Sequence, residues 1–215
     1  MSITVIDHPI VRAELSKLRL TTTSPKDFRE GIKQISFILG IEASRSLEEA
    51  TFQGETPISA FTGTIIKPRV GLTPILRAGL GMSDALANSG PSDAPVYHLG
   101  IFREKVTLQP VEYYSKLPSK PNVDLVYLLD PLIATGGTAN AALSMLLDWG
   151  IPVLPVKNIK LLCVLASKAG LDNVKAAHPE LDIWVAGVDD VLTQNGLISP
   201  GLGDTGDRLF STVRP

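Results

Sequence analysis

The sequence predicts an α/β fold in which a mainly parallel sheet is flanked by helices, and three features support this. From residue 69 onward, short apolar runs recur, and most lack the strict alternation of a strand with one solvent-exposed face. Helix-like segments at 78–89, 138–149 and 168–177 lie between several of these runs, as in a parallel sheet with crossover helices. Polar residues follow the runs directly, where ligands bind in such sheets.

The first part of the chain is predicted to be helical. Residues 9–20 carry apolar side chains at roughly helical spacing. In the next segment Ser24 can cap a helix and Pro25 suits its first position, while Asp27 and Glu30 suit its positive end. The apolar residues of this helix that fall on one face are Phe28, Ile32, Ile35, Ile38 and Leu39. Together the two segments should form a helical layer with a stripe facing the core.

Residues 51–66, TFQGETPISAFTGTII, differ from both neighbouring regions. They alternate loosely and contain Gly54, Pro57 and Gly63, a pattern that predicts a β-hairpin arm. An arm that projects from a globular body often meets a partner subunit. An ordinary surface hairpin is the alternative.

The predicted strands of the sheet are the apolar runs VGLTPIL, VYHLGIF, DLVYLL, IKLLCVLA and DIWVAGV. The polar residues that follow them are Arg77, Arg103, Asp130, Asp189 and Asp190. The interval 103–123 breaks the pattern, because it holds three prolines and two adjacent tyrosines without a helical stripe. A connection of this length is expected to be a mobile lid, a hairpin or a binding loop.

Composition narrows the class of protein. The 215 residues suit one domain, 1–215, with the arm at about 51–66 and a C-terminal segment at about 190–215. Hydrophobic residues are 44% and charged residues 20%, so a sizeable core can form. The formal charge is −2 and no basic block is present, which argues against a nucleic-acid-binding protein.

Other compositional features point to a protein of a reducing compartment. No apolar run approaches the roughly 18 residues that span a bilayer, and the N-terminus lacks the long apolar region of a signal peptide. We therefore expect a cytoplasmic protein without a membrane partner. Cys163 lies inside an apolar run and is expected to be a buried core thiol. The three histidines are far apart, so a zinc site is not expected.

The stretch LLDPLIATGGTANAAL carries the clearest chemical signal. A loop between a strand and a helix start exposes unpaired N–H groups at the positive end of the helix, which is a ready phosphate site. Gly136 and Gly137 would let a phosphate approach the backbone, and Thr135 and Thr138 add hydroxyl donors. Asp130, at the strand end, is placed to accept hydrogen bonds from sugar hydroxyls. The stretch therefore predicts a sugar-phosphate site.

Two other phosphate-binding loops are excluded by the sequence. It has no GxxxxGK[ST] motif of a P-loop NTPase, and no GxGxxG opens a first βαβ unit. A capped turn with small residues remains the structural alternative for the TGGT segment.

Three motifs carry a resemblance to a known family. DPLIATGGT resembles the motif of phosphoribosyltransferases that binds 5-phospho-α-D-ribose 1-diphosphate (PRPP), and Pro131 in second place is typical of uracil phosphoribosyltransferases. TPILRAGLGM is similar to the family segment with a PRPP-binding arginine. ISPGLGDTGDRLF is similar to the family's uracil-binding signature. Because weaker likeness covers nearly the whole chain, the sequence resembles the uracil phosphoribosyltransferases.

This resemblance implies a fold and a set of site residues. The fold would be the type I phosphoribosyltransferase fold, with N-terminal helices, a β-hairpin arm and a C-terminal base-binding hood. The implied PRPP-binding residues are Arg77, Arg103, Asp130, Pro131, Leu132, Ile133, Ala134, Thr135, Gly136, Gly137, Thr138 and Asp204. The implied uracil-binding residues are Ile198, Gly203, Asp204 and Thr205, and the implied catalytic residues are Asp204, Arg103 and Asp130. Thr205 stands where alanine is common in the family, so its larger side chain should affect the base contacts.

The resemblance also implies an activity. The chain would convert uracil and PRPP to UMP and diphosphate in pyrimidine salvage. Mg²⁺ would be bound mainly through the diphosphate of PRPP, with no protein side chain assigned as a metal ligand. The implied partners are a second copy of the chain, in a homodimer or higher homo-oligomer, and GTP as an effector. Two alternatives stay open, namely a phosphoribosyltransferase for another base and a non-enzymatic PRPP-sensing regulatory protein of the same fold.

Overall fold

The computed structural model describes residues 3–89, 93–103, 110–150 and 156–212. The helices are α1 (Pro9–Arg19), α2 (Pro25–Ser44), α3 (Leu80–Ser89), α4 (Gly137–Gly150), α5 (Lys168–Ala177) and α6 (Thr205–Phe210), with one 3₁₀ turn at Val156–Asn158. The strands are β1 (Ile3–Val5), β2 (Glu49–Glu55), β3 (Ala60–Ile66), β4 (Val70–Leu76), β5 (Leu99–Arg103), β6 (Pro110–Ser115), β7 (Leu125–Leu129), β8 (Leu132–Ile133), β9 (Ile159–Ser167), β10 (Asp182–Asp189), β11 (Val191–Leu192) and β12 (Ile198–Ser199).

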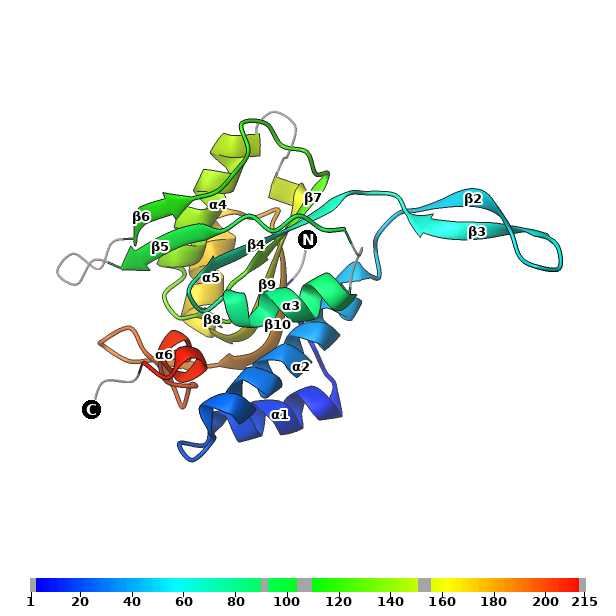
Figure 1. Cartoon of the computed structure of the whole chain (residues 1–215). Coiled ribbons are helices and arrows are strands. Elements are labelled where there is room, and N and C mark those ends of the chain that lie inside the picture. Colours follow the sequence, from blue (N-terminus) through cyan, green and yellow to red (C-terminus); the bar gives the residue numbers. More distant parts are fainter. Residues whose placement is uncertain (1–2, 90–92, 104–109, 151–155, 213–215) are drawn as a thin grey trace.

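The main sheet has the strand order β1-β10-β9-β7-β4-β5-β6, and β8 adds to β9 (Figure 1). All neighbours on this path run parallel except β6, which pairs antiparallel with β5. The predicted parallel α/β sheet is thus confirmed. Three of its strands were not predicted: β1 has three residues, β8 has two, and β6 lies inside the interval 103–123.

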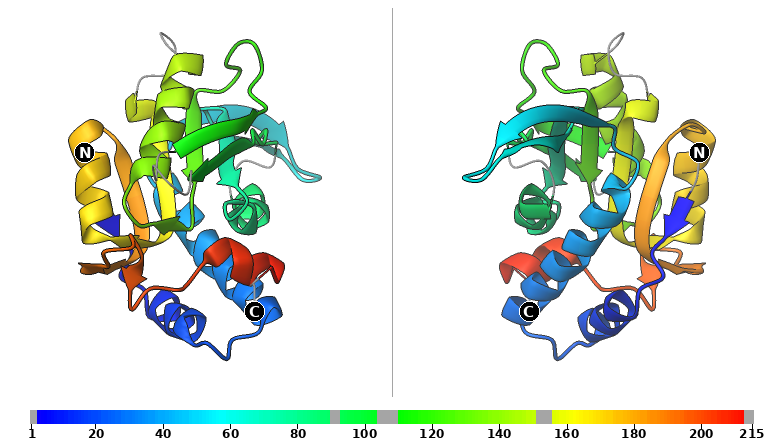
Figure 2. Two further views of the ribbon diagram at one scale, coloured as in Figure 1. Left: turned by 90° about the vertical axis from the view of Figure 1, so that its left-hand side faces the viewer. Right: turned by 90° about the vertical axis from the view of Figure 1, so that its right-hand side faces the viewer.

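Helices cover both faces of the sheet, which gives three layers (Figure 2). Side chains of α1, α2, α3 and α6 form one buried cluster with one face. Side chains of α4 and α5 form a second cluster with the other. Every residue of β9 is buried, which explains why its sequence does not alternate. Cys163 lies in this strand as the predicted core thiol, and burial raises its pKa.

Helix α2 begins as its sequence predicts. Ser24 is the N-cap, and its Oγ accepts a hydrogen bond from the Asp27 N–H at 3.1 Å. Pro25 takes the first helical position, where a backbone donor is not needed. The predicted stripe faces the core, with Phe28, Ile32, Ile35 and Leu39 fully buried and Ile38 partly buried against the same cluster.

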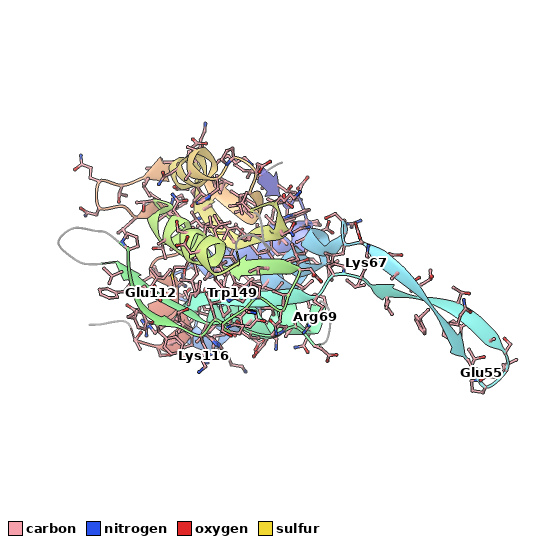
Figure 3. All side chains as sticks on the ribbon, turned by 90° about the horizontal axis from the view of Figure 1, so that it is seen from above. Glu55, Lys67, Arg69, Glu112, Lys116 and Trp149 are labelled. Carbon is pink, nitrogen blue, oxygen red and sulfur yellow. The ribbon has the colours of Figure 1, made fainter. Side chains whose placement is uncertain are left out.

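The arm predicted at 51–66 is the hairpin β2–β3, which extends away from the body (Figure 1). Seen from above in Figure 3, Glu55 lies toward its far end and Lys67 at its base. Phe52 pairs across the strands with Gly63, and the rings of Phe52 and Phe61 meet edge to face with centroids 5.8 Å apart. A Cβ on Gly63 would lie 2.4 Å from the Phe52 ring, so the glycine makes room for the aromatic side chain.

Helix α6 is anchored to the N-terminal helices. Arg208 donates hydrogen bonds to the Leu18 carbonyl at 2.5 Å and the Leu20 carbonyl at 2.7 Å. Arg29 of α2 donates to the Leu209 carbonyl at 2.8 Å. Segments from opposite ends of the chain are therefore joined on one side of the sheet.

None of the helices within the described ranges is long and apolar enough to cross a membrane.

Candidate active site

A cavity of about 470 Å³ opens beyond the carboxyl ends of β4, β5 and β7. This size falls in the range of small-molecule sites. A cavity of about 540 Å³ near Lys67, Lys157 and Lys160 is as large, so volume alone does not identify the site. What distinguishes the first cavity is its lining of Ile75, Leu76, Arg77, Ala78, Ile101, Phe102, Tyr113, Asp130, Leu132, Thr138, Leu197, Gly203, Asp204, Thr205 and Gly206. The three motifs singled out in the sequence meet here.

A smaller cavity of about 50 Å³ lies against the predicted phosphate loop. It is lined by Asp130, Leu132, Ile133, Ala134, Thr135, Gly136, Thr138 and Ala139. Two side chains from the α5 region hold this loop, since Ser167 Oγ donates to the Ala134 carbonyl at 2.5 Å and Asn173 Nδ2 donates to the Thr135 carbonyl at 2.8 Å. In a trans peptide the N–H points away from the C=O. The N–H groups that follow these carbonyls are therefore directed away from α5.

The two glycines of the loop have different roles. Gly136 adopts a φ of 82°, and a Cβ there would lie 2.7 Å from the Gly170 carbonyl oxygen. Its carbonyl accepts the first helical bond, from the Asn140 N–H at 2.9 Å. Among the described residues outside its own helix and chain neighbours, a Cβ on Gly137 would come within 4 Å of Thr135 Oγ1 alone, at 3.7 Å. Gly136 is thus required by the backbone, whereas Gly137 leaves open space at the start of α4.

Asp130 lies directly after β7 at the junction of both cavities, where it was predicted. Its residue surface is 8% exposed, and its Oδ1 accepts a weak hydrogen bond from the Leu132 N–H at 3.4 Å. Burial raises its pKa to about 7, and the Leu132 hydrogen bond opposes this rise. The carboxyl can therefore gain or lose a proton near neutral pH.

Arg77 and Arg103 follow neighbouring strands. Arg77 lies between β4 and α3 and lines the cavity with a half-exposed side chain. Its Nη2 pairs with Asp207 Oδ1 at 2.9 Å. Arg103 is the last residue of β5, but its side chain lies outside the described part of the structure. The backbone thus brings both arginines to the same edge of the sheet.

The C-terminal segment forms the opposite wall of the cavity. Asp204 is exposed and caps α6, because its Oδ1 accepts a hydrogen bond from the Asp207 N–H at 2.9 Å. Gly203 has a φ of 73°, which favours glycine. Thr205 is 2% exposed, and its Oγ1 has no hydrogen-bond partner among the described residues. The Thr205 hydroxyl is therefore turned into the protein.

Among the predicted site residues whose side chains the structure describes, three line neither cavity, namely Pro131, Gly137 and Ile198. Pro131 is buried, and its carbonyl accepts a hydrogen bond from the Leu165 N–H at 3.0 Å. Ile198 pairs with Leu192 in the β11–β12 hairpin and packs against the core.

Asp189, which was expected to follow its strand toward the ligand edge, instead ends β10 in an ion pair. Arg19 Nη2 lies 2.7 Å from its Oδ1, and the Gly201 N–H donates to its Oδ2 at 2.9 Å. Burial would raise the pKa of Asp189, but the hydrogen bonds from Arg19 and Gly201 lower it below its ordinary value. The side chain holds the C-terminal segment and does not line the cavity.

Tyr113 lines the cavity although it was not predicted as a site residue. The β5–β6 register pairs Gly100 with Tyr114 and Ile101 with Glu112, so Tyr113 is the extra residue of a β-bulge. A Cβ on Gly100 would lie 2.7 Å from the Tyr113 ring. Such bulges often re-aim a side chain beside an active site. The available signal in the sequence was the pair of adjacent tyrosines in the interval 103–123.

Within the described ranges, no group of three or more His, Cys, Asp or Glu side chains is placed to hold a metal ion.

Comparison with known proteins agrees with this arrangement. The family model described as uracil phosphoribosyltransferase matches residues 5–212. The uracil phosphoribosyltransferase of Roseiflexus sp. is 45% identical over 208 residues, covering 97% of each chain. That of Alkaliphilus metalliredigens is 44% identical over 209 residues, also covering 97% of each.

Solved structures share the fold. The AQ2163 protein from Aquifex aeolicus is 32% identical, with a TM-score of 0.91 over 100% of both chains. APRTase from Giardia lamblia is 16% identical with a TM-score of 0.52 over 82% of this chain and 86% of that one, a likeness of fold alone. The expected type I phosphoribosyltransferase fold is confirmed. Because the family model matches residues 5–212 and relatives that are 44% and 45% identical cover 97% of the chain, the chain belongs to the uracil phosphoribosyltransferase family.

Proposed function

We propose that the 470 Å³ cavity binds uracil and PRPP and joins them to give UMP and diphosphate. The observation that carries the proposal is the meeting of three separate motifs at this cavity. They supply a phosphate loop, a carboxyl for the ribose, an arginine for the diphosphate and a glycine-rich wall for the base.

The 5′-phosphate would lie at the start of α4. The first N–H groups of a helix have no partner within it, and the helix dipole favours an anion there. The open space above Gly137 leaves room for the phosphate, and Thr138 adds a hydroxyl that lines both cavities. The hydrogen bonds from Ser167 and Asn173 fix the loop before the ligand arrives.

Asp130 would bind the ribose through its carboxylate. Ribose hydroxyls donate hydrogen bonds, so they favour the ionised carboxyl and should lower its raised pKa. This contact would orient C1′ toward the base.

The reaction needs no covalent intermediate with the protein. Uracil N1 forms a bond to C1′ while the bond from C1′ to the diphosphate oxygen breaks; the oxygen keeps the bonding pair, and the N1 proton is released to solvent. Positive charge develops on the sugar and negative charge on the departing diphosphate. Arg77 and Arg103 would stabilise the diphosphate with paired charged hydrogen bonds. Asp204, which faces the cavity from the base side, would polarise the reacting groups.

The base would be bound by the main chain of the C-terminal wall, around Gly203, Asp204 and Thr205, which line the cavity. Backbone donors and acceptors can match the O4 and N3 edge of uracil. Cytosine presents the opposite pattern at this edge and would leave buried groups unpaired. This contact would set the specificity for uracil.

Mg²⁺ is the metal that the family resemblance implies. The oxygen atoms of a diphosphate, with carboxylates such as Asp130 and Asp204 nearby, are the ligands this ion prefers. We propose that Mg²⁺ is held mainly by the diphosphate, where it would neutralise negative charge.

The arm would contact a second copy of the chain. One face of the hairpin carries Phe52, Phe61 and Ile65, and each of these side chains is at least 41% exposed. The other face carries polar residues such as Thr62 and Thr64. A two-stranded hairpin alone is marginally stable, so its apolar face needs cover.

The test is formation of UMP from uracil and PRPP with Mg²⁺, with cytosine as the competing base. Arg77→Ala and Arg103→Ala should each lower kcat/KM for PRPP by about 100-fold. PRPP binding without UMP would favour the non-enzymatic sensor, and product from another base would reassign the specificity. Adding GTP to the same assay tests the implied effector.

A further inference from the structure

The C-terminal segment holds the Arg77 guanidinium in place. Arg77 Nη2 donates to Asp207 Oδ1 at 2.9 Å, and Nη1 donates to Thr212 Oγ1 at 3.2 Å. Thr212 Oγ1 in turn donates to Asp207 Oδ1 at 2.6 Å. These three side chains form a closed hydrogen-bonded set, the Arg77 triad.

The triad joins distant parts of the chain. Arg77 follows β4, whereas Asp207 lies in α6, 130 positions later. Asp207 is itself fixed, because its N–H donates to Asp204 Oδ1 at 2.9 Å. The Arg77 Cζ also lies 5.8 Å from the centre of the Phe210 ring. The direction of the guanidinium is therefore set largely by α6.

The triad leaves donors for a ligand. A guanidinium has five N–H donors, and within the described residues the Arg77 guanidinium uses two of them, in its bonds to Asp207 and Thr212. The Arg77 side chain is 50% exposed and lines the cavity. Asp207 can thus hold Arg77 without consuming the donors that a diphosphate needs.

We infer that Asp207 is a positioning residue that directs Arg77 at the diphosphate of PRPP. The inference rests on the proposed function, because it takes Arg77 to bind the diphosphate. It gives a role to the final acid of the segment GLGDTGD, which lines neither cavity.

The first experiment is steady-state kinetics of Asp207→Asn. We expect kcat/KM for PRPP to fall about tenfold or more, because small misplacements of a reacting group cost rate steeply. The KM for uracil should stay within about twofold, since Asp207 does not line the cavity. Asp7→Asn is the matched control, because Asp7 pairs with Arg12 on the exposed surface near α1. It should leave both constants unchanged.

The hydroxyl of the triad offers a milder test with less risk to folding. Thr212→Ser keeps the hydroxyl and should behave like the parent. Thr212→Val keeps the shape but removes the donor and acceptor, so PRPP kinetics should change in the same direction as in Asp207→Asn. If Asp207→Asn fails to fold, as judged by its thermal unfolding midpoint, the comparison of Thr212→Ser with Thr212→Val tests the inference instead. Equal kinetics for the two Thr212 variants would then overturn the inference.

A double-mutant cycle separates positioning from other roles. In the Arg77→Ala background, Asp207→Asn should have no further effect on PRPP kinetics. Additive losses would overturn the inference, because Asp207 would then act independently of Arg77. A lower KM for PRPP in Asp207→Asn would also overturn it, because the carboxylate would then compete with the diphosphate. If Arg77→Ala alone left PRPP kinetics unchanged, the proposed diphosphate site would fail instead.

Discussion

Asp130 is the residue whose protonation state should govern PRPP binding. Its pKa of about 7 in the ligand-free protein means that below pH 7 a proton must leave before ribose hydroxyls can bind the carboxylate. The affinity for PRPP should therefore fall by up to about tenfold per pH unit below 7. We expect calorimetric titrations between pH 6 and 8 to show this slope in the parent and a shallower one in Asp130→Asn.

The ionisation of PRPP itself contributes equally to both proteins, so the difference between the slopes isolates Asp130. Parallel slopes for the two proteins would show that the Asp130 carboxylate does not bind the ribose.

The raised pKa of Asp130 also affects the stability of the protein. The folded state holds the proton up to pH 7 while the unfolded state loses it near the ordinary value of 3.8. The free energy of unfolding should thus fall as the pH rises between these values, and less so in Asp130→Asn.

Thr205 carries a buried hydroxyl without a partner in the described structure. We expect Thr205→Val to raise the free energy of unfolding by about 1 kcal/mol, because an unsatisfied polar atom is replaced by a methyl group. The KM for uracil should not change if the base is bound by the main chain. Chemical denaturation and initial rates check the two statements. A higher KM for uracil would mean that the hydroxyl rotates to bind the base.

A candidate site residue can be predicted from the sequence when the pattern that indicates it lies within a few neighbouring positions. Asp130 and Gly136 fall inside one continuous motif, so the strand end and the turn already define their surroundings. The roles of Asp207 and Thr212 could not be predicted, because their contacts with Arg77 depend on how segments far apart in the sequence pack.

Within one element, the loop before α4, alanine substitutions of the neighbouring residues Gly136 and Gly137 should have different effects. Gly136→Ala should lower the free energy of unfolding by about 2 kcal/mol or more, because alanine is strained at positive φ and its Cβ would meet the Gly170 carbonyl. Gly137→Ala should fold at least as well, since alanine favours a helix. It should raise the KM for PRPP, because its methyl group enters the proposed phosphate space.

Thermal unfolding and PRPP kinetics of both variants make the comparison. Normal PRPP kinetics in a folded Gly137→Ala protein would place the phosphate elsewhere.

Most elements follow from periodicity and caps, as α2 illustrates with its proline start and buried stripe. The exception is β6, because the sequence alone does not decide whether the interval 103–123 is a lid, a hairpin or a binding loop. A short strand with a bulge at Tyr113 does not alternate, so its pairing with β5 is specified by tertiary contacts rather than by its own pattern.

At the scale of the whole molecule, the apolar face of the arm should determine self-association. Ile65→Lys places a charge on that face, where the side chain is 51% exposed, and should shift the protein toward smaller assemblies. Thr64→Lys puts the same charge on the opposite face of the ribbon and should have a smaller effect. Light scattering over a range of concentrations measures the mass. Equal masses for the parent and both variants would exclude the arm as the contact.

The parallel sheet itself can be predicted from the sequence, because repeated apolar runs with helices between them admit few topologies. Its edge strands cannot be predicted in this way. β1 joins β10, and β6 joins β5, only through long-range pairing of short segments.

The anchoring of α6 by Arg208 and Arg29 has a consequence during protein synthesis. A nascent chain that still lacks α6 can already form the main sheet and the helices α1 to α5, but one wall of its cavity is absent. Neither the base wall nor the support for Arg77 exists until the ribosome has added residue 212. Catalytic competence should therefore not appear before α6 and residue 212 have been synthesised.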